Sequence, residues 1–272
     1  MICLTIDVHH MSLKTSDQKR LVGTTEAKIA EEFIRLAQDR DIKLTCFLTG
    51  KLVEEEPTKS FKSFDNLEIG GHTYNAFKPE IFHRISKKLI GSYCGPKWYQ
   101  KRDIRKTVEI IRKRMGIGIS SWRNHAYFSD RNTLLLLQEC GIKILSDGTS
   151  KGQVLPILDK SGVYTFPINI LPDHEHLFHS DRTPETVKKW VKRYNWSDVF
   201  TEKSYSVNEW YEIVKEQIKE REQNGEISVA IIHPICLYLC DGNKTILKLL
   251  DFFKEFETIY LKESVNYIVK NK

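Results

Sequence analysis

Short apolar stretches alternate with amphipathic stretches along the whole chain. The apolar stretches are rich in β-branched side chains and end at polar or turn-forming residues, a pattern typical of buried strands. We expect strands at residues 2–6, 43–48, 67–70, 117–122, 142–145, 163–168, 227–232 and 258–261. Apolar residues at helical spacing predict helices at residues 24–38, 79–90, 103–115, 130–140, 184–191, 207–223 and 245–256, with a closing helix after the last strand. Residues 51–66 and 91–99 are expected to be inserted loops.

Strands that alternate with helices in this way predict an α/β fold built on a parallel sheet. Seven or eight such units suit an irregular (β/α)7–8 barrel. The chain contains neither an internal repeat nor a linker rich in Gly, Ser or Pro, so we expect one domain over residues 1–272.

Composition narrows the class of protein. The 272 residues are 40% hydrophobic and 29% charged, as in an ordinary globular protein, and this is too apolar for a disordered chain. The net charge of +6 is spread without a dense basic block, so nucleic acid is not an expected partner. A membrane-spanning helix is not expected either, because every apolar stretch is shorter than about 18 residues.

The location expected from the sequence is cytoplasmic. Asp7 falls where the apolar segment of a secretory signal peptide would run. The six cysteines form no CxxC pair, and most lie in apolar segments, so we expect buried, reduced thiols.

Candidate chemistry gathers where the expected strands end. In parallel α/β folds the functional site lies beyond the carboxyl ends of the strands. Seven of the nine histidines lie at or just past such ends, namely His9, His10, His72, His125, His174, His176 and His233. A single histidine there would usually be structural, but their shared position, together with Asp7 and Arg123, indicates one functional site.

Imidazole and carboxylate together suit a divalent metal ion such as zinc. The ion would polarise a carbonyl and activate water, a carboxylate would take the proton, and a histidine would protonate the leaving group. This is hydrolysis of an amide or ester. Other chemistries lack their motifs, since there is no GxxxxGK[ST] phosphate loop, no GxGxxG after the first strand and no GxSxG elbow.

Five segments in order resemble the polysaccharide deacetylase family, the metal-dependent sugar N-deacetylases with NodB homology. The family has Thr-Phe-Asp-Asp or Asp-x-Asp, then His-Ser/Thr-x-x-His, an Arg after an aromatic residue, an Asp near the substrate, and Leu-x-Ile-His-Pro. The matching segments are residues 5–10 (TIDVHH), 70–76 (GGHTYNA), 122–125 (WRNH), 171–174 (LPDH) and 230–234 (AIIHP).

The resemblance implies a role for each matched residue. Asp7 corresponds to the general base, Arg123 to the residue that keeps this carboxylate ionised, and His233 to the general acid. His72 corresponds to a metal ligand, and Thr73 would hold the segment that carries it. His10, Thr73, His125, Asp173 and His174 are further candidates for the substrate-binding surface.

Two positions depart from the family pattern. The metal-binding Asp of the first motif is replaced by Val8 or His9, depending on the alignment. Alternation along a strand puts His9 on the same side as Asp7, so His9 is our second candidate ligand. The second histidine of the second motif is Ala76, which leaves three alternatives open: a ligand from His10, His125 or His174, additional water on the metal, or a site without metal.

The resemblance implies a metal-dependent deacetylase, with zinc as the expected ion, and the N-terminal sequence and cysteines predict that it is cytoplasmic. Its substrate would be an N-acetylated sugar, nucleotide- or lipid-linked, used in surface polysaccharide synthesis. Two alternatives stay open. Ala76 favours a non-catalytic member that binds a carbohydrate or a partner, and distant relatives suggest a hydrolase of a non-sugar amide.

Overall fold

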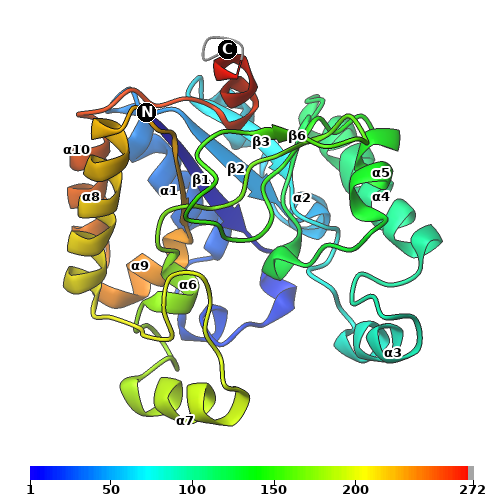
Figure 1. Ribbon diagram of the computed structural model, residues 1–272, viewed down its shortest axis with the longest axis horizontal. Helices are drawn as coiled ribbons and strands as arrows, with labels where there is room; N and C mark the ends of the chain where they lie inside the picture. The colour runs from blue at the N-terminus through cyan, green and yellow to red at the C-terminus, as the bar shows by residue number, and fades with distance from the viewer. Residues whose placement is uncertain (269–272) are drawn as a thin grey trace.

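A curled sheet of eight strands runs through the computed structural model, which describes residues 1–268 (Figure 1). The strand order is β6-β7-β5-β4-β3-β2-β1-β8, and every neighbouring pair is parallel except the hairpin β6–β7. The strands are β1 (Ile2–Val8), β2 (Leu44–Leu48), β3 (Leu67–Gly71), β4 (Ser121–Trp122), β5 (Ile144–Leu145), β6 (Ile157–Leu158), β7 (Tyr164–Thr165) and β8 (Ser228–Ile232). The α/β barrel expected from the sequence is therefore confirmed in an irregular form.

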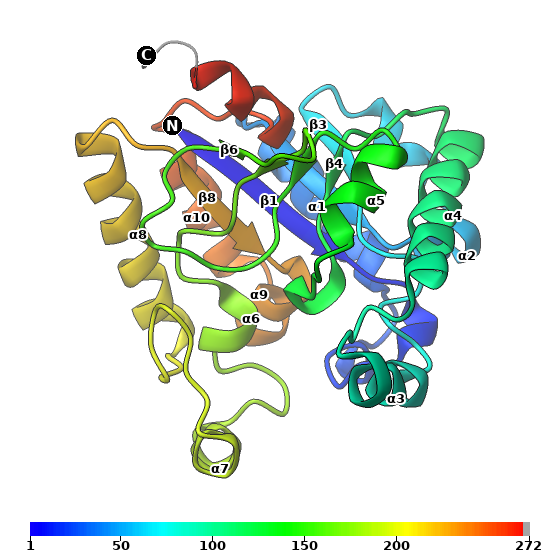
Figure 2. The ribbon, with the colours of Figure 1, turned by 45° about the vertical axis from the view of Figure 1, so that its right-hand side comes forward.

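Most of the helices pack around the outside of this sheet (Figure 2). The full set of helices is α1 (Glu26–Gln38), α2 (Gly50–Glu55), α3 (Glu80–Ile90), α4 (Lys97–Met115), α5 (Thr133–Glu139), α6 (Asp173–His176), α7 (Pro184–Tyr194), α8 (Val207–Gln223), α9 (Pro234–Asp241) and α10 (Lys244–Phe253). In both ribbon views α3 and α7 project from the body of the molecule, beyond the end of the sheet where β1 finishes. Within residues 1–268, no helix is long and apolar enough to cross a membrane.

Strand alternation divides the core into two parts. Ile2, Leu4, Ile6 and Val8 of β1 pack in the large cluster between sheet and helices. Cys3 points to the other side, into a smaller cluster with Phe47, Phe166 and Val229 inside the curl of the sheet. By alternation, the side chain of Asp7 also points to this inner side. Because Asp7 is near the end of β1, its carboxylate lies over the carboxyl end of the barrel.

An irregular segment closes the gap between β8 and the far half of the barrel. The amide N–H of Asn169 donates to the carbonyl of Val229 at 3.2 Å. The Asn169 side chain does more: Oδ1 accepts from Val229 N at 2.7 Å and Nδ2 donates to Ile227 O at 2.9 Å. One buried amide therefore replaces part of a strand ladder at the point where the sheet would otherwise stay open.

Most of the expected elements are found, with shifted ends. The helix expected at 207–223 is confirmed with the same bounds, and that at 184–191 continues to Tyr194. The strand expected at 258–261 is wrong: Thr258 makes one isolated bridge to Ile2, and a 3-10 helix follows at Leu261–Tyr267. Residues 51–66 are not simply a loop, because they contain most of α2 and a 3-10 turn at Lys59–Ser63. The expectation also missed α9, whose residues are apolar on most sides and so lack helical periodicity.

Two glycines in β3 allow bulky side chains of neighbouring strands to lie across it. A Cβ on Gly70 would stand 2.6 Å from the ring of Phe47, and one on Gly71 would stand 2.3 Å from the ring of Trp122. Both rings are fully buried. The close approach fixes Trp122 immediately before Arg123, so the packing of β3 bears directly on the end of β4.

We expect Gly71→Ala to lower the free energy of unfolding by about 1–3 kcal/mol, because the buried Trp122 ring cannot move away freely. Gly118→Ala is the matched control, since a Cβ there meets nothing within 4 Å and the residue is exposed. Urea unfolding of the two variants measures the difference. Equal stabilities would show that the ring is not held in place.

Candidate active site

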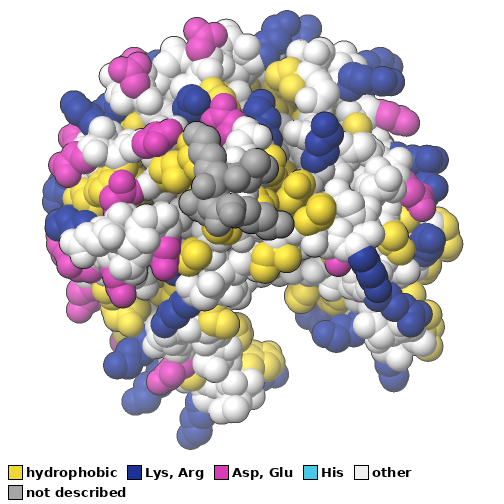
Figure 3. Space-filling view, turned by 45° about the horizontal axis from the view of Figure 1, so that its top comes forward, with side chains coloured by type: hydrophobic (Ala, Val, Ile, Leu, Met, Phe, Trp, Pro, Cys, Tyr) yellow, Lys and Arg dark blue, Asp and Glu magenta, His cyan; other side chains and the backbone are white. Residues whose placement is uncertain are grey.

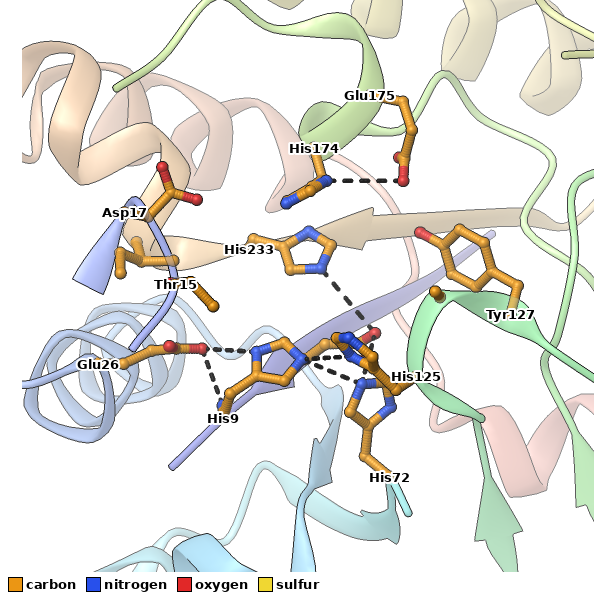
Figure 4. A pocket seen from close by; sticks show the side chains of 13 residues that line it. His9, Thr15, Asp17, Glu26, His72, His125, Tyr127, His174, Glu175 and His233 are labelled. Carbon is orange, nitrogen blue, oxygen red and sulfur yellow. Dashed lines mark hydrogen bonds and ion pairs between the residues drawn. The ribbon is translucent and has the colours of Figure 1, made fainter. Parts of the chain in front are cut away.

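Three histidines converge at the carboxyl ends of the strands (Figure 4). His9 follows β1, His72 follows β3, and His125 lies in a 3-10 turn, His125–Tyr127, after β4. His9 Nε2 lies 3.2 Å from His72 Nε2 and 3.1 Å from His125 Nδ1. The arrangement offers three imidazole nitrogens, all within 4.8 Å of one another, to one ion.

The hydrogen bonds on the far side of two rings decide which nitrogens carry protons. His72 Nδ1 lies 2.9 Å from the backbone carbonyl of Arg123, which can only accept, so this nitrogen donates. His9 Nδ1 likewise donates to Glu26 Oε1 at 2.9 Å. In the neutral rings, the two facing Nε2 atoms therefore carry lone pairs.

Two lone pairs 3.2 Å apart repel each other, and only a cation between them or protonation of one ring relieves this contact. Protonation is disfavoured at His72, because burial, together with the positive charges nearby, lowers its pKa to about 3. Burial also holds the pKa of His125 well below its usual range. Three converging imidazole nitrogens are also a donor set that fits a metal ion, and the separation is close to the roughly 3.3 Å expected of two imidazoles on one tetrahedral zinc.

Asp7 lies beside this three-histidine group in a fully buried ion pair. Asp7 Oδ1 accepts from Arg123 Nη1 at 2.9 Å. The other oxygen, Oδ2, lies 3.8 Å from His72 Nε2 and faces the cavity. Burial by itself would raise the pKa of Asp7, but the Arg123 guanidinium, helped by His72, lowers it to about 2, so this carboxylate is ionised at neutral pH.

His233 carries a positive charge, opposite to that of the Asp7 carboxylate. Its ring Nδ1 donates to Asp173 Oδ1 at 2.8 Å, and its backbone N–H donates to Asp173 Oδ2 at 2.6 Å. Burial opposes the charged form, but the Asp173 carboxylate outweighs it and raises the pKa of His233 to about 9. His233 Nε2 then carries a proton, 4.0 Å from Asp7 Oδ2.

A cavity of about 130 Å³ lies over these groups. Asp7, His9, His72, His125 and His233 line it, and His174 stands at its rim with half of its side chain exposed. Glu26 and Tyr127 also line the cavity, and the sequence analysis singled out neither of them. No local signal distinguishes Glu26, because a glutamate in the first turn of a helix is common and only the packing of α1 brings it to His9.

Other candidate residues lie behind the cavity instead of facing it. His10 points away from the three histidines, and its Nδ1 lies 3.2 Å from Thr49 Oγ1. Thr73 donates to the carbonyl of His72 at 2.6 Å and accepts from the N–H of Ala76 at 3.2 Å, so it shapes the turn that follows His72. Asp173 is fully buried, and both of its oxygens are bound to His233. Ala76 contributes no ligand atom, and the third nitrogen of the group comes from His125.

His125 owes its position to a buried anchor one residue earlier. Asp147 accepts from the backbone N–H and from Nδ2 of Asn124, each at 2.7 Å, and Asn124 Oδ1 accepts from Trp122 Nε1 at 2.9 Å. Burial raises the pKa of Asp147 to about 7. The Asn124 side chain is thus held from two sides, which aims His125 across the barrel at His9.

Comparison with solved structures identifies the architecture. Over 99% of this chain and 90% of the other, the structure matches a protein from Mycobacterium smegmatis described as a polysaccharide deacetylase, with 14% identity and a TM-score of 0.69. A second protein so described, from Pseudomonas aeruginosa PAO1, matches over 100% and 91% of the two chains, with 11% identity and a TM-score of 0.65. The chain has the polysaccharide deacetylase fold.

The same fold also carries other chemistry. A 4-alpha-glucanotransferase from Thermococcus litoralis matches over 97% of this chain and 40% of its own, with 12% identity and a TM-score of 0.58. No family model and no curated protein matches the sequence. The polysaccharide deacetylase fold is thus shown by structure, while the chemistry of this chain rests on its own residues.

We expect replacement of His9, His72 or His125 by Ala to abolish tight metal binding, and Glu26→Gln to weaken it by about 10–100-fold through loss of the partner that orients His9. Metal content per chain after dialysis, and titration with zinc, measure both effects. His10→Gln is the control, because His10 is adjacent in sequence but bonded to Thr49. Retention of metal by all three alanine variants would exclude this site.

Proposed function

We propose that this protein is a metal-dependent hydrolase that removes an acetyl or other N-acyl group from a sugar or sugar-linked precursor. One observation carries the proposal: an ionised carboxylate, Asp7, and a protonated imidazole, His233, lie together beside a three-histidine group that fits a cation. Amide hydrolysis needs this combination of a base, an acid and an electrophile.

The proton transfers follow from the hydrogen bonds of each group. A divalent ion on His9, His72 and His125, for which zinc suits the three imidazoles best, would polarise the acyl carbonyl and make water easier to deprotonate. Asp7 Oδ2 takes the proton from the attacking water, while Arg123 holds the other oxygen and keeps the carboxylate ionised. His233 Nε2 donates its proton to the departing amine, and Asp173 fixes the ring through Nδ1.

The ion pairs Asp7–Arg123 and His233–Asp173 help to decide between an enzyme and a non-catalytic binding protein. A binding module has no use for a carboxylate and an imidazole held in opposite charge states, so these pairs favour an enzyme over a non-catalytic member. The carbohydrate substrate is supported by the neighbours of the same fold. All six cysteines are free, which fits a reducing compartment, and we propose a single-domain cytoplasmic enzyme that acts on a precursor of a surface polysaccharide.

We expect His233→Ala to lower kcat for deacetylation by about 10²–10⁴-fold, because the departing amine then lacks its proton donor. The substrates to assay are nucleotide-linked N-acetyl sugars, with acetate release as the readout. Metal content should stay at the wild-type level, which separates loss of the acid from loss of the ion. Unchanged kcat in a folded, metal-loaded variant would remove His233 from the reaction.

The acid also sets the expected pH dependence. His233 acts in its protonated form, and its pKa is raised to about 9, so activity should persist at neutral pH and fall as pH rises through about 9. Asp173→Asn removes the charge that raises this pKa, and the alkaline limb should then move to lower pH. Profiles of kcat against pH for both proteins measure the shift. An unmoved limb in an active Asp173→Asn variant would contradict the assignment of the acid.

A further inference from the structure

Helix α3 presents its apolar residues to solvent. Ile81, Ile85 and Leu89, spaced four residues apart, are 69%, 51% and 75% exposed and form one stripe along the helix. The side that packs on the body of the protein is more polar, with His83 and Ser86 as its buried residues. This reversal of the usual pattern leaves an apolar stripe without a partner among the described residues.

Basic residues accompany this stripe and cover the second projecting helix. On α3, Arg84 and Lys88 flank the stripe. Lys87 lies on the same helix, and Glu80 is its one acidic residue. On α7, the exposed residues Lys188, Lys189, Lys192 and Arg193 stand against one acidic residue. The two helices together carry seven basic and two acidic residues, a net charge of +5, whereas the whole chain has a net charge of +6. Figure 3 shows Lys and Arg side chains on both projections, with a gap between them.

Both projections border the mouth of the candidate active site. A hollow of about 260 Å³ reaches from the start of α3 to His125, lined in part by Phe77, Lys78, Glu80 and Phe128. A second hollow, of about 340 Å³, reaches from α7 to His174 and includes Trp190. A surface touched by both helices at once would therefore face the cavity over the three histidines.

We propose that α3 and α7 dock this protein on an anionic lipid surface, with the stripe of Ile81, Ile85 and Leu89 entering the headgroup region. A helix with an apolar stripe and flanking lysines and arginines is suited to lie in a membrane interface, and basic residues add attraction to anionic lipids. The charge of the two projections is complementary to such a surface. Resting on the proposed function, the docking also names the substrate class: an acylated sugar joined through phosphate to a lipid, with its sugar reaching the cavity.

Vesicle flotation tests the docking with the full chain. We expect binding to vesicles of phosphatidylcholine with phosphatidylglycerol, weakening as salt rises, and little binding to phosphatidylcholine alone. Ile85→Ser/Leu89→Ser should weaken binding by about tenfold or more through lost apolar burial. Lys188→Gln/Lys189→Gln should weaken it by about fivefold for each lysine.

Two double variants elsewhere on the surface serve as controls. One removes exposed apolar side chains and the other removes lysines, both away from α3 and α7. Ile157→Ser/Leu158→Ser removes two residues that are 57% and 56% exposed on β6, at the opposite end of the molecule in Figure 1. Lys215→Gln/Lys219→Gln removes two lysines of α8. Neither control should change vesicle binding. Equal losses in test and control pairs, or no preference for anionic vesicles, would overturn the docking.

Activity and metal content separate this inference from the proposed function. The α3 and α7 variants leave the three histidines, Asp7 and His233 untouched, so their metal content and their hydrolysis of acylated sugars in free solution should match the wild type. Normal hydrolysis without vesicle binding would refute the docking alone, and vesicle binding with no hydrolysis of either nucleotide-linked or lipid-linked sugars would refute the function alone. Dimers that Ile85→Ser/Leu89→Ser dissociates in ultracentrifugation would assign the stripe to a second copy of the chain.

Discussion

The ion pair between Asp7 and Arg123 is the constraint on which the rest of the site depends. Arg123 is fully buried, and besides Asp7 it donates to Thr5 Oγ1, Ser146 O and Ser146 Oγ. A buried charge that loses its partner costs several kcal/mol, so the strands that supply these groups must keep their relative positions. The pair thus joins the carboxyl ends of β1, β4 and β5, and the histidines that follow β1 and β4 inherit their geometry from it.

A second layer of hydrogen bonds sets the proton state of each reacting group. Glu26 and the Arg123 carbonyl each accept a hydrogen bond from the outer nitrogen of a histidine, which leaves lone pairs facing the centre of the site. Asp173 has the reverse effect on His233, whose charged form it stabilises. In the proposed reaction, the same side-chain type would therefore serve as ligand or as acid according to its hydrogen-bond partner and not according to its position on the barrel.

The fold alone would not distinguish these roles, because a glucanotransferase shares it at a similar level of identity. What separates the chemistries is the set of side chains at the strand ends. Here Ala76 offers no nitrogen, and His125, after a different strand, completes a group of three imidazoles that could hold one ion. Helices α3 and α7, which project beyond the barrel, place exposed apolar and basic side chains near this site.

The sequence by itself determined most of the strands and helices in their order, though not α2 or α9, because apolar periodicity is local, and it placed Asp7, His72, Arg123 and His233 at strand ends. Only the tertiary structure decided the third nitrogen of the group and the place of Glu26, since both depend on how turns and helices pack against distant strands. The strand expected at 258–261 was wrong for the same reason: apolar residues there cover the barrel interior through Ile259 and Leu261 without a ladder. Local pattern fixes which residues can meet, and long-range packing selects which of them do.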